Sequence, residues 1–300
     1  MNKLLKYYFV SILVTLLILT TYLNNDSENY SYTDSKFYPA DYELIKRTFP
    51  YYDYDKDAYK DAFETVKELK SQKRLSKESD LKTELEFVGP INIGGRVVDI
   101  EFNPVSPNIV YAAAATGGVF KSTDVGQTWF PIFDEQPSLT IGDIGIDPND
   151  PDILYVGTGE ANGGHNNFPG SGIYKSTDAG LSWEFIGLDS TASIGRVIVD
   201  PANSSRIFVA AVGSYFSPNA QRGVYLSEDS GETWKKSLFV SDSTGAIDLV
   251  IDPSNSQILY AAMWERVRRP VFRSGTHLYG PSGGIFKSID GGSTWNKLGP

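Results

Sequence analysis

The 300-residue sequence has no cysteine, only two histidines and only two methionines. The lack of cysteine excludes disulfides, thiolate metal ligands and a cysteine nucleophile. The two histidines are far apart in the chain, so no zinc site is predicted. The sequence contains neither a P-loop nor a dinucleotide-binding glycine motif that opens a helix, and we expect no cofactor and no metal.

Basic residues are also scarce, with 27 Lys and Arg against 37 Asp and Glu, for a net charge of -10. Nucleic-acid binding requires clustered basic side chains, so no nucleic-acid partner is expected. Hydrophobic residues make up 41% of the chain and aromatic residues 13%, which excludes a wholly disordered protein. Short runs rich in Tyr, Phe, Val and Ile are separated by turn residues, and this pattern predicts an all-β fold.

Residues 1–23 have the composition of an export signal. Lys3 and Lys6 precede a mostly apolar, uncharged stretch at 7–23, which is typical of a signal peptide. The stretch is slightly short for a membrane-spanning helix. We expect a cleaved signal peptide or, alternatively, an uncleaved signal anchor that would be the only membrane contact. In both cases the protein is exported, as a secreted, periplasmic or cell-surface protein.

Residues 24–84 form a polar, tyrosine-rich segment with one expected helix, at about 57–73. Its apolar stripe has helical spacing and consists of Tyr59, Phe63, Val66 and Leu69. Asp57 is a suitable N-cap. The acidic residues at 53–64 also imitate a calcium loop, but Ala58 stands where that loop requires glycine. A capped helix is therefore preferred over a calcium site.

One eight-residue pattern occurs four times, at 122–129, 176–183, 227–234 and 288–295. Five of its positions keep their residue type: Ser, Asp, Gly, Ser or Thr, and Trp. These types suit a tight hairpin turn, because Asp accepts turn N–H groups, Gly adopts positive φ and the hydroxyl completes the network. The residues assigned this structural role are Asp124, Gly126, Trp129, Asp178, Gly180, Trp183, Asp229, Gly231, Trp234, Asp290, Gly292 and Trp295.

Each copy belongs to a longer repeat. A short aromatic strand precedes each turn, and two further strands joined by an Asp-Pro or Asn-Pro turn come before it. A repeat of this length with four antiparallel strands predicts a blade of a β-propeller. Residues 85–300 are predicted to form four such blades.

The eight-residue pattern resembles the Asp-box, or BNR repeat, of sialidases, sortilin-type propellers and xyloglucanase-type glycosidases. The segments VGPINIGGR at 88–96, GTGE at 157–160 and AMWERVRRP at 262–270 resemble long secreted bacterial proteins of the sortilin-like or glycosyl-hydrolase BNR-repeat type. This resemblance implies the propeller architecture and leaves the activity open.

Residues 85–89, LEFVG, match the outer strand WEFIG at 183–187. We expect this segment to complete the last blade of a ring, because closure removes exposed sheet edges. The fourth repeat already has its own outer strand. Further repeats after Pro300 are therefore expected, and the chain reads as the amino-terminal part of a longer protein. A closed four-bladed ring is the alternative.

Ligands are expected on the face that carries the long loops at 157–171, 213–222 and 264–283. A charged residue lies four positions before each proline turn, at Asp99, Asp143, Arg196 and Asp248. These four should surround the mouth of the central channel, where Arg196 either pairs with its neighbours as a structural network or contacts a ligand. The other ligand-binding candidates are Arg96, His165, Trp264, Arg266, Arg268 and Arg269.

Two functions stay open at this point. The sortilin resemblance implies a non-enzymatic scaffold for a protein, peptide or carbohydrate ligand, which is the preferred hypothesis. The xyloglucanase resemblance implies a glycoside hydrolase, which needs two carboxylates about 5 to 10 Å apart. The candidate catalytic residues are Asp99, Asp143, Asp248, Glu160 and Glu265. A sialidase is not expected, because the Arg-Ile-Pro segment of that family does not precede the first Asp-box.

Overall fold

A computed structural model describes residues 58–75, 95–162, 168–215, 218–266 and 280–299. The expected export signal, the 85–89 strand, Asp57 and the rest of the calcium-like segment before Ala58 lie outside these residues. The described part contains one α-helix, α3 (Ala58–Leu75), where a helix was expected. Within the described residues, no helix is long and apolar enough to cross a membrane.

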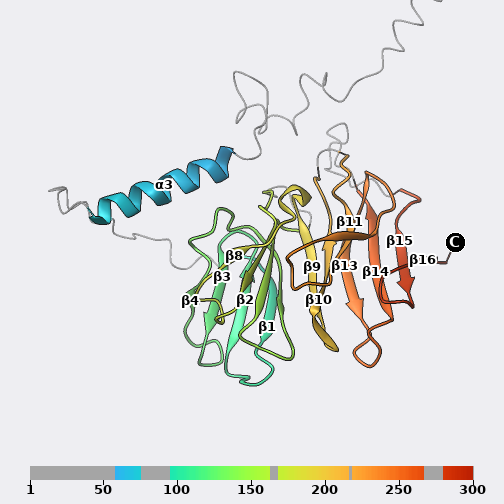
Figure 1. Cartoon of the computed structure of the whole chain (residues 1–300), viewed down its shortest axis with the longest axis horizontal. Helices are drawn as coiled ribbons and strands as arrows, with labels where there is room; N and C mark the ends of the chain where they lie inside the picture. Colours follow the sequence, from blue (N-terminus) through green and yellow to red (C-terminus); the bar gives the residue numbers. More distant parts are fainter. Residues whose placement is uncertain (1–57, 76–94, 163–167, 216–217, 267–279, 300) are drawn as a thin grey trace, which may run out of the picture. The chain divides into compact units, whose positions relative to one another are not determined.

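The four repeats form four separate four-stranded antiparallel sheets, so the predicted all-β class is confirmed (Figure 1). We call them blades 1 to 4. Blade 1 consists of β1 (Val97–Phe102), β2 (Val110–Ala114), β3 (Gly118–Ser122) and β4 (Phe130–Pro131). Blade 2 consists of β5 (Ile141–Ile146), β6 (Leu154–Thr158), β7 (Ile173–Ser176) and β8 (Glu184–Phe185). A short 3₁₀ helix, Asp189–Thr191, follows blade 2.

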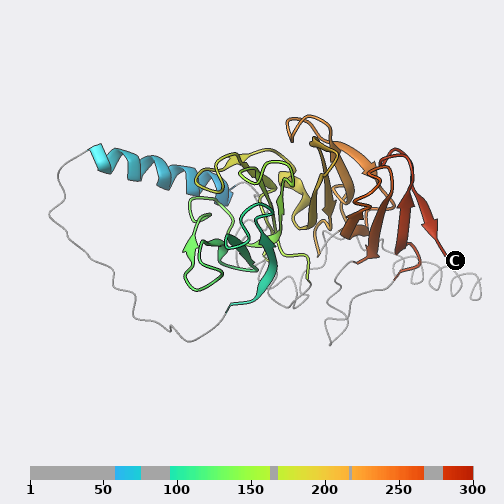
Figure 2. The same ribbon diagram turned by 90° about the horizontal axis from the view of Figure 1, so that it is seen from below.

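Blade 3 consists of β9 (Ile194–Asp200), β10 (Asn203–Ala211), β11 (Gly223–Ser227) and β12 (Lys235–Leu238). Blade 4 consists of β13 (Thr244–Ile251), β14 (Leu259–Glu265), β15 (Gly284–Ser288) and β16 (Asn296–Leu298). The sheets follow one another in chain order (Figure 2). Their first strands β1, β5, β9 and β13 are successive neighbours and form the inner edge.

Apolar side chains fill the spaces between blades. Tyr111 of blade 1 belongs to one buried cluster with Ile141 and Leu154 of blade 2. Equivalent clusters join blade 2 to blade 3 and blade 3 to blade 4. Near the inner edge the backbones approach closely, since a Cβ on Gly142 would lie 1.8 Å from the carbonyl oxygen of Ile194. Only glycine fits there.

The Asp-box turns share one hydrogen-bond network. In the second box, Ser176 Oγ donates to Asp178 Oδ1 at 2.7 Å and accepts from Gly180 N at 2.8 Å. Ser182 donates from both N and Oγ to the Asp178 carboxylate. The other three boxes repeat these bonds. The box glycines have positive φ, as expected, and so do the residues before them, including Val125 (60°) and Ala179 (57°).

The boxes also connect neighbouring blades. Trp183 Nε1 donates to Ile132 O and Trp234 Nε1 to Ile186 O, both at 2.7 Å. In each case the acceptor lies three residues after the Trp of the preceding blade. Trp295 follows the same rule, with Ser237 Oγ as its acceptor at 2.9 Å.

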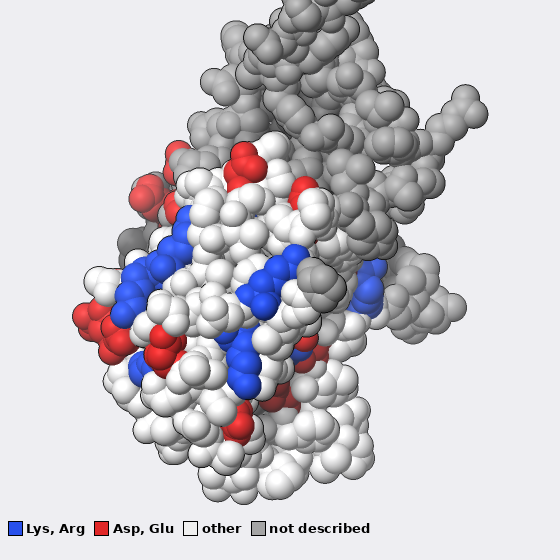
Figure 3. Space-filling model, turned by 90° about the vertical axis from the view of Figure 1, so that its right-hand side faces the viewer, with Lys and Arg blue, Asp and Glu red and all other residues white. Residues whose placement is uncertain are grey.

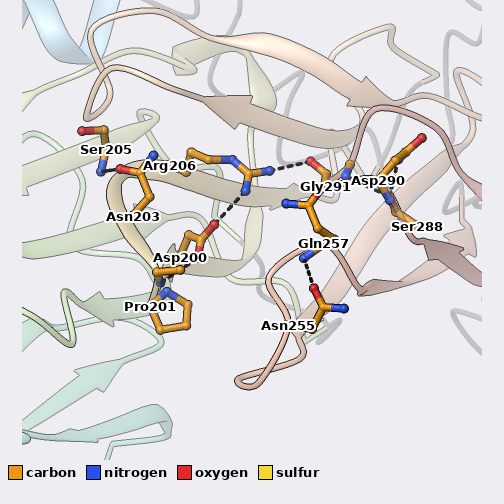
Figure 4. Close-up of polar contacts among 12 residues, drawn as sticks. Asp200, Pro201, Asn203, Ser205, Arg206, Asn255, Gln257, Ser288, Asp290 and Gly291 are labelled. Carbon is orange, nitrogen blue, oxygen red and sulfur yellow. Dashed lines mark hydrogen bonds and ion pairs between the residues drawn. The ribbon is translucent and has the colours of Figure 1, made fainter.

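A Lys or Arg side chain of the preceding blade donates a hydrogen bond to the backbone carbonyl of the fourth residue of the next box. Lys121 Nζ donates to Ala179 O at 2.9 Å, and Lys175 Nζ to Ser230 O at 3.2 Å. Blade 3 has Leu226 at the equivalent strand position, and Arg206 replaces the lysine: its NH2 group donates to Gly291 O at 2.6 Å (Figure 4). Two hydrogen bonds therefore join each blade to the box of the next blade: one from the box Trp and one to the carbonyl of the fourth box residue.

Candidate functional site

The four charged residues of the inner strands each follow a β-bulge. The register between β1 and β2 shifts between Val97 and Asp99. The same irregularity lies directly before Asp143, Arg196 and Asp248. A bulge bends its strand and redirects the neighbouring side chain. The fourfold bulge therefore gives these four residues equivalent positions in the four blades.

Asp99 and Asp143 accept hydrogen bonds from backbone N–H groups beside the bulge of the following blade. Asp99 Oδ2 accepts from Ile144 N at 3.2 Å, and Asp143 Oδ2 accepts from Val197 N at 2.7 Å. Blade 3 has Arg196 in place of an acid. In blade 4 the corresponding N–H, that of Leu249, instead donates to its own neighbour Asp248 at 2.9 Å.

Arg196 bridges the two acids on either side of it. Its Nε donates to Asp248 Oδ1 at 2.9 Å and its NH1 to Asp143 Oδ1 at 3.0 Å. This pairing is the one that the structural alternative predicted. Burial raises the pKa of the Asp143 carboxyl well above its usual value, an effect that Arg196 opposes and Asp99 reinforces. Asp143 is 3% exposed, whereas Asp248 is 48% exposed and open to solvent.

An open hollow of about 390 Å³ lies along the inner strands, and its charged lining residues are Glu101 and Arg196. Burial and the nearby Asp99 raise the pKa of Glu101 to about 7, against the opposing effect of Arg196. A carboxyl group that titrates near neutrality marks a candidate functional position. Sequence reasoning missed Glu101, although a residue two positions after Asp99 lies on the same face of the strand.

The long loops of blades 2, 3 and 4 contact one another through five residues that we call the loop cluster: Glu160, Tyr215, Arg222, Trp264 and Arg266. Tyr215 Oη donates to Glu160 O at 3.1 Å. The Arg266 guanidinium lies 4.2 Å from the ring centre of Tyr215 and 4.3 Å from that of Trp264. Such stacking on aromatic faces is favourable for a desolvated guanidinium.

Arg222 holds the same loops by binding backbone carbonyls. Its NH1 group donates to Val212 O at 2.9 Å and to Arg266 O at 3.1 Å. The side chain is fully buried, and burial lowers its pKa to about 10. Sequence reasoning missed Arg222 and Tyr215. Tyr215 bonds to Glu160 of blade 2, and Arg222 bonds to Arg266 of blade 4 as well as to its own blade, so no local sequence pattern predicted these contacts.

Arg96 connects blade 1 to the loop cluster. Its Nε donates to Glu160 Oε1 at 2.8 Å and its NH2 to Glu160 Oε2 at 2.5 Å. Arg96 is 55% exposed while the carboxylate of Glu160 is buried. Glu265 lies apart from this pair and accepts hydrogen bonds from Ser282 N at 3.0 Å and Ser282 Oγ at 2.6 Å.

The structure thus divides the candidate residues into two groups. Asp99, Asp143, Arg196 and Asp248 lie together on the inner strands, whereas Arg96, Glu160, Trp264 and Arg266 meet at the loops. His165, Arg268 and Arg269 fall outside the described residues. Over the described ranges, no three His, Asp or Glu side chains are grouped so as to hold a metal ion.

Comparison with known proteins finds relatives among xyloglucanases. A xyloglucanase of a Paenibacillus species is 28% identical over 227 residues, covering 68% of this chain and 21% of that enzyme. Xyloglucanase Xgh74A of Acetivibrio thermocellus is 30% identical over 173 residues, covering 46% and 19%. An oligoxyloglucan-reducing end-specific xyloglucanase of Emericella nidulans is 24% identical over 216 residues, covering 68% and 24%.

A solved structure shares the fold. The crystal structure of an ancestral GH74 enzyme matches with a TM-score of 0.50 and 21% identity, over 69% of this chain and 24% of that one. No protein-family model matches the sequence. The chain spans about a fifth of the length of the curated relatives it matches. Its blades are thus distantly similar to part of xyloglucanase-type BNR propellers.

Proposed function

We propose that this chain is part of a glycoside hydrolase of the xyloglucanase type and that its loop face holds a xyloglucan-class polysaccharide. The observation that carries the proposal is the 28% identity to the Paenibacillus xyloglucanase across 68% of the chain. The preferred hypothesis from sequence, a sortilin-like scaffold, has no comparable support among the relatives found.

The residues around the loop cluster suit a sugar ligand. Trp264 is a half-buried aromatic residue at this site, and Arg96 and Glu265 offer charged donors and acceptors for hydroxyl groups. Aromatic surface combined with a few placed polar groups is the usual composition of a small-molecule or sugar site. The buried Arg222 and Arg266 keep these loops in place on the rigid blades.

Burial narrows the choice of catalytic carboxylates. Glycoside hydrolysis needs two acids that reach the scissile bond from opposite sides. Asp143 and Glu160 are only 3% and 1% exposed, so a substrate does not reach them and they are poor candidates. The Asp248 side chain is 48% exposed, and Asp99 and Glu265 are both half-buried. Of the five acids that the sequence suggested, Asp99, Asp248 and Glu265 therefore remain as catalytic candidates.

A second candidate function is polysaccharide binding without hydrolysis. It is favoured by one observation: each of the five candidate acids accepts at least one hydrogen bond inside the protein. Such bonds fix the orientation of each carboxylate within the protein, whereas a hydrolase needs two acids that reach the scissile bond.

The test measures binding and turnover separately on the full chain. Calorimetry with xyloglucan, and with starch as a control polysaccharide, reports binding, and release of reducing ends reports hydrolysis. We expect Trp264→Phe to weaken xyloglucan binding at least about threefold, and Lys235→Ala, at an exposed site on blade 3, to leave it unchanged. Turnover that falls in Asp248→Asn or Glu265→Gln supports the hydrolase. Binding without turnover supports the second candidate, and absence of both overturns the proposal.

A further inference from the structure

The hollow along the inner strands lies where described blades meet. It has a volume of about 390 Å³, and its walls come from β1, β5, β9 and β13. In a propeller the first strands of the blades surround a central channel. The hollow therefore belongs to the channel wall, and further blades of a ring would face it across the channel instead of covering it.

A glycine widens this hollow beside Glu101. The residues two positions after the charged residue of each inner strand are Glu101, Gly145, Ile198 and Val250. They share one strand position, and all four line the hollow. Only blade 2 has no side chain there. The hollow therefore reaches across Gly145, from Glu101 in blade 1 to Arg196 in blade 3.

Apart from these two charged residues, the lining of the hollow is apolar. Ile146, Ile198, Leu249 and Val250 are among its wall residues. Val250 is 52% exposed, so the wall is open to a solute. Apolar surface with a few placed polar groups is typical of a small-molecule site. A ligand of this hollow needs an apolar part and a charge that suits its polar end.

Acidic groups outnumber basic ones at that polar end. The Arg196 guanidinium already donates to Asp143 and Asp248, at 3.0 and 2.9 Å. Asp99 and Glu101 add two further carboxyl groups on β1. On the side of the molecule shown in Figure 3, in contrast, acidic and basic side chains are interspersed. The charge around the hollow therefore favours a cationic ligand.

The Glu101 carboxylate has no counter-ion among the described residues. It accepts no hydrogen bond and forms no ion pair there, and burial and Asp99 raise its pKa to about 7 against the opposing effect of Arg196. Lys121 lies over the ring of Tyr111, the cross-strand neighbour of Glu101, but donates to a backbone carbonyl of blade 2. A bound cation would supply the missing opposite charge and favour ionised Glu101.

We propose that this hollow binds a primary ammonium group on a short apolar chain, either a free alkylamine or the side chain of a lysine in a partner protein. The ammonium donates a hydrogen bond to the Glu101 carboxylate, and the apolar chain lies against Ile198 and Val250. An ammonium group has three N–H donors and no acceptor, which suits a carboxylate without a partner. The site is separate from the loop face, so its test does not depend on xyloglucan binding.

The experiment titrates the full 300-residue chain at about pH 8 with n-butylamine, 1-butanol and butyrate, which differ mainly in charge. NMR measures each dissociation constant. We expect butylammonium to bind at least about tenfold more tightly than 1-butanol, because an ion pair is added to the apolar contact, and butyrate to bind less tightly than either. At about pH 6 the affinity for butylammonium should fall several-fold, because Glu101 is then mostly protonated while the amine keeps its charge.

Two variants separate the charged part of the site from its apolar part. Glu101→Gln removes the charge and keeps the shape, so butylammonium should bind no more tightly than 1-butanol. Val250→Trp fills the hollow and should weaken the binding of both probes. Glu184→Gln, on the exposed strand β8, removes a charge elsewhere and should bind like wild type. Circular dichroism checks that every variant folds.

Three outcomes overturn the proposal. The first is a wild type that binds none of the probes or does not prefer butylammonium. The second is a Glu101→Gln variant that keeps the preference, and the third is binding that survives in Val250→Trp, which would place the amine outside the hollow. Nα-acetyl-lysine amide then identifies the source of the ammonium. Tighter binding than that of butylamine indicates a lysine side chain, and weaker binding indicates a free alkylamine.

Discussion

The indole N–H of Trp183 in blade 2 donates to the carbonyl oxygen of Ile132 in blade 1, at 2.7 Å. The same ring packs edge-on against Phe133, with 5.1 Å between ring centres. The Trp of an Asp-box therefore does more than cover its own turn. It also stabilises the packing of blade 2 against blade 1.

This dual role predicts unequal effects for equivalent tryptophans. Trp183→Ala should lower the free energy of unfolding by about 3 kcal/mol, because it removes a large side chain and leaves a cavity between two blades. Trp129→Ala should cost less than about 1 kcal/mol, because the Trp129 indole donates to its own turn and is 39% exposed. Urea denaturation of both variants measures the difference. Equal losses would contradict the inter-blade role.

The box aspartates predict acid sensitivity. Hydrogen bonds from Ser182 and Ser176 lower the pKa of Asp178 to about 2, and Asp124, Asp229 and Asp290 behave alike. Since the folded-state pKa lies below the unfolded value, this contribution is complete above about pH 4 and disappears as the pH falls toward 2. Asp178→Asn should reduce the pH dependence of unfolding in that window. Glu184→Gln, on the exposed strand β8, serves as the control and should not reproduce the change.

Glu101 predicts a pH effect of opposite sign. Its pKa is raised to about 7, so the folded state prefers the protonated carboxyl, and ionisation destabilises the fold as pH rises from about 4.5 through 7. Glu101→Gln should therefore raise stability relative to wild type at pH 8 and change it little at pH 4. Thermal unfolding at the two pH values measures this. A variant that is equally stabilised at both would show that Glu101 acts through packing instead.

Arg206 predicts a large effect at the junction of blades 3 and 4. Its NH1 donates to Asp200 Oδ2 at 2.7 Å and its NH2 to Gly291 O at 2.6 Å, and Asp200 is 1% exposed (Figure 4). Arg206→Ala leaves that carboxylate buried without a cation and should cost roughly 3 to 5 kcal/mol. Arg206→Lys should cost less, because one ammonium can serve one of the two acceptors. Urea denaturation measures the loss of unfolding free energy in both variants. Equal losses in Arg206→Ala and Arg206→Lys would show that the ion pair contributes little to stability.

The sheets and turns were predictable because they depend on local pattern. Alternating strands and the spacing of Ser, Asp, Gly and Trp identified four blades without any tertiary information. The positive φ of Val125 was missed, since a β-branched residue is an unfavourable choice for that conformation. It is imposed by a network whose other members are Ser122, Asp124 and Thr128.

The candidate site was only half predictable. The position of Arg196 between two acids followed from the repeat, because equivalent positions in neighbouring blades must be close. The burial of Arg222 and Arg266 did not follow, since loop arginines are usually solvated and each of these two also bonds to a carbonyl of another blade. Tertiary contacts, and not sequence spacing, decide whether such a charge lies inside.

One set of connectors between blades belongs to the boxes and the strands beside them, and a second set lies in the loop cluster on the opposite side. The connection between the second and third strands is short in blade 1, at 115–117, and long in blade 4, at 266–283, yet the boxes keep eight residues throughout. The box side of the sheets is thus uniform from blade to blade, whereas the loop side varies in length. An exchange of loops would have to preserve the contacts of Tyr215, Arg222 and Arg266, because these side chains also join neighbouring blades.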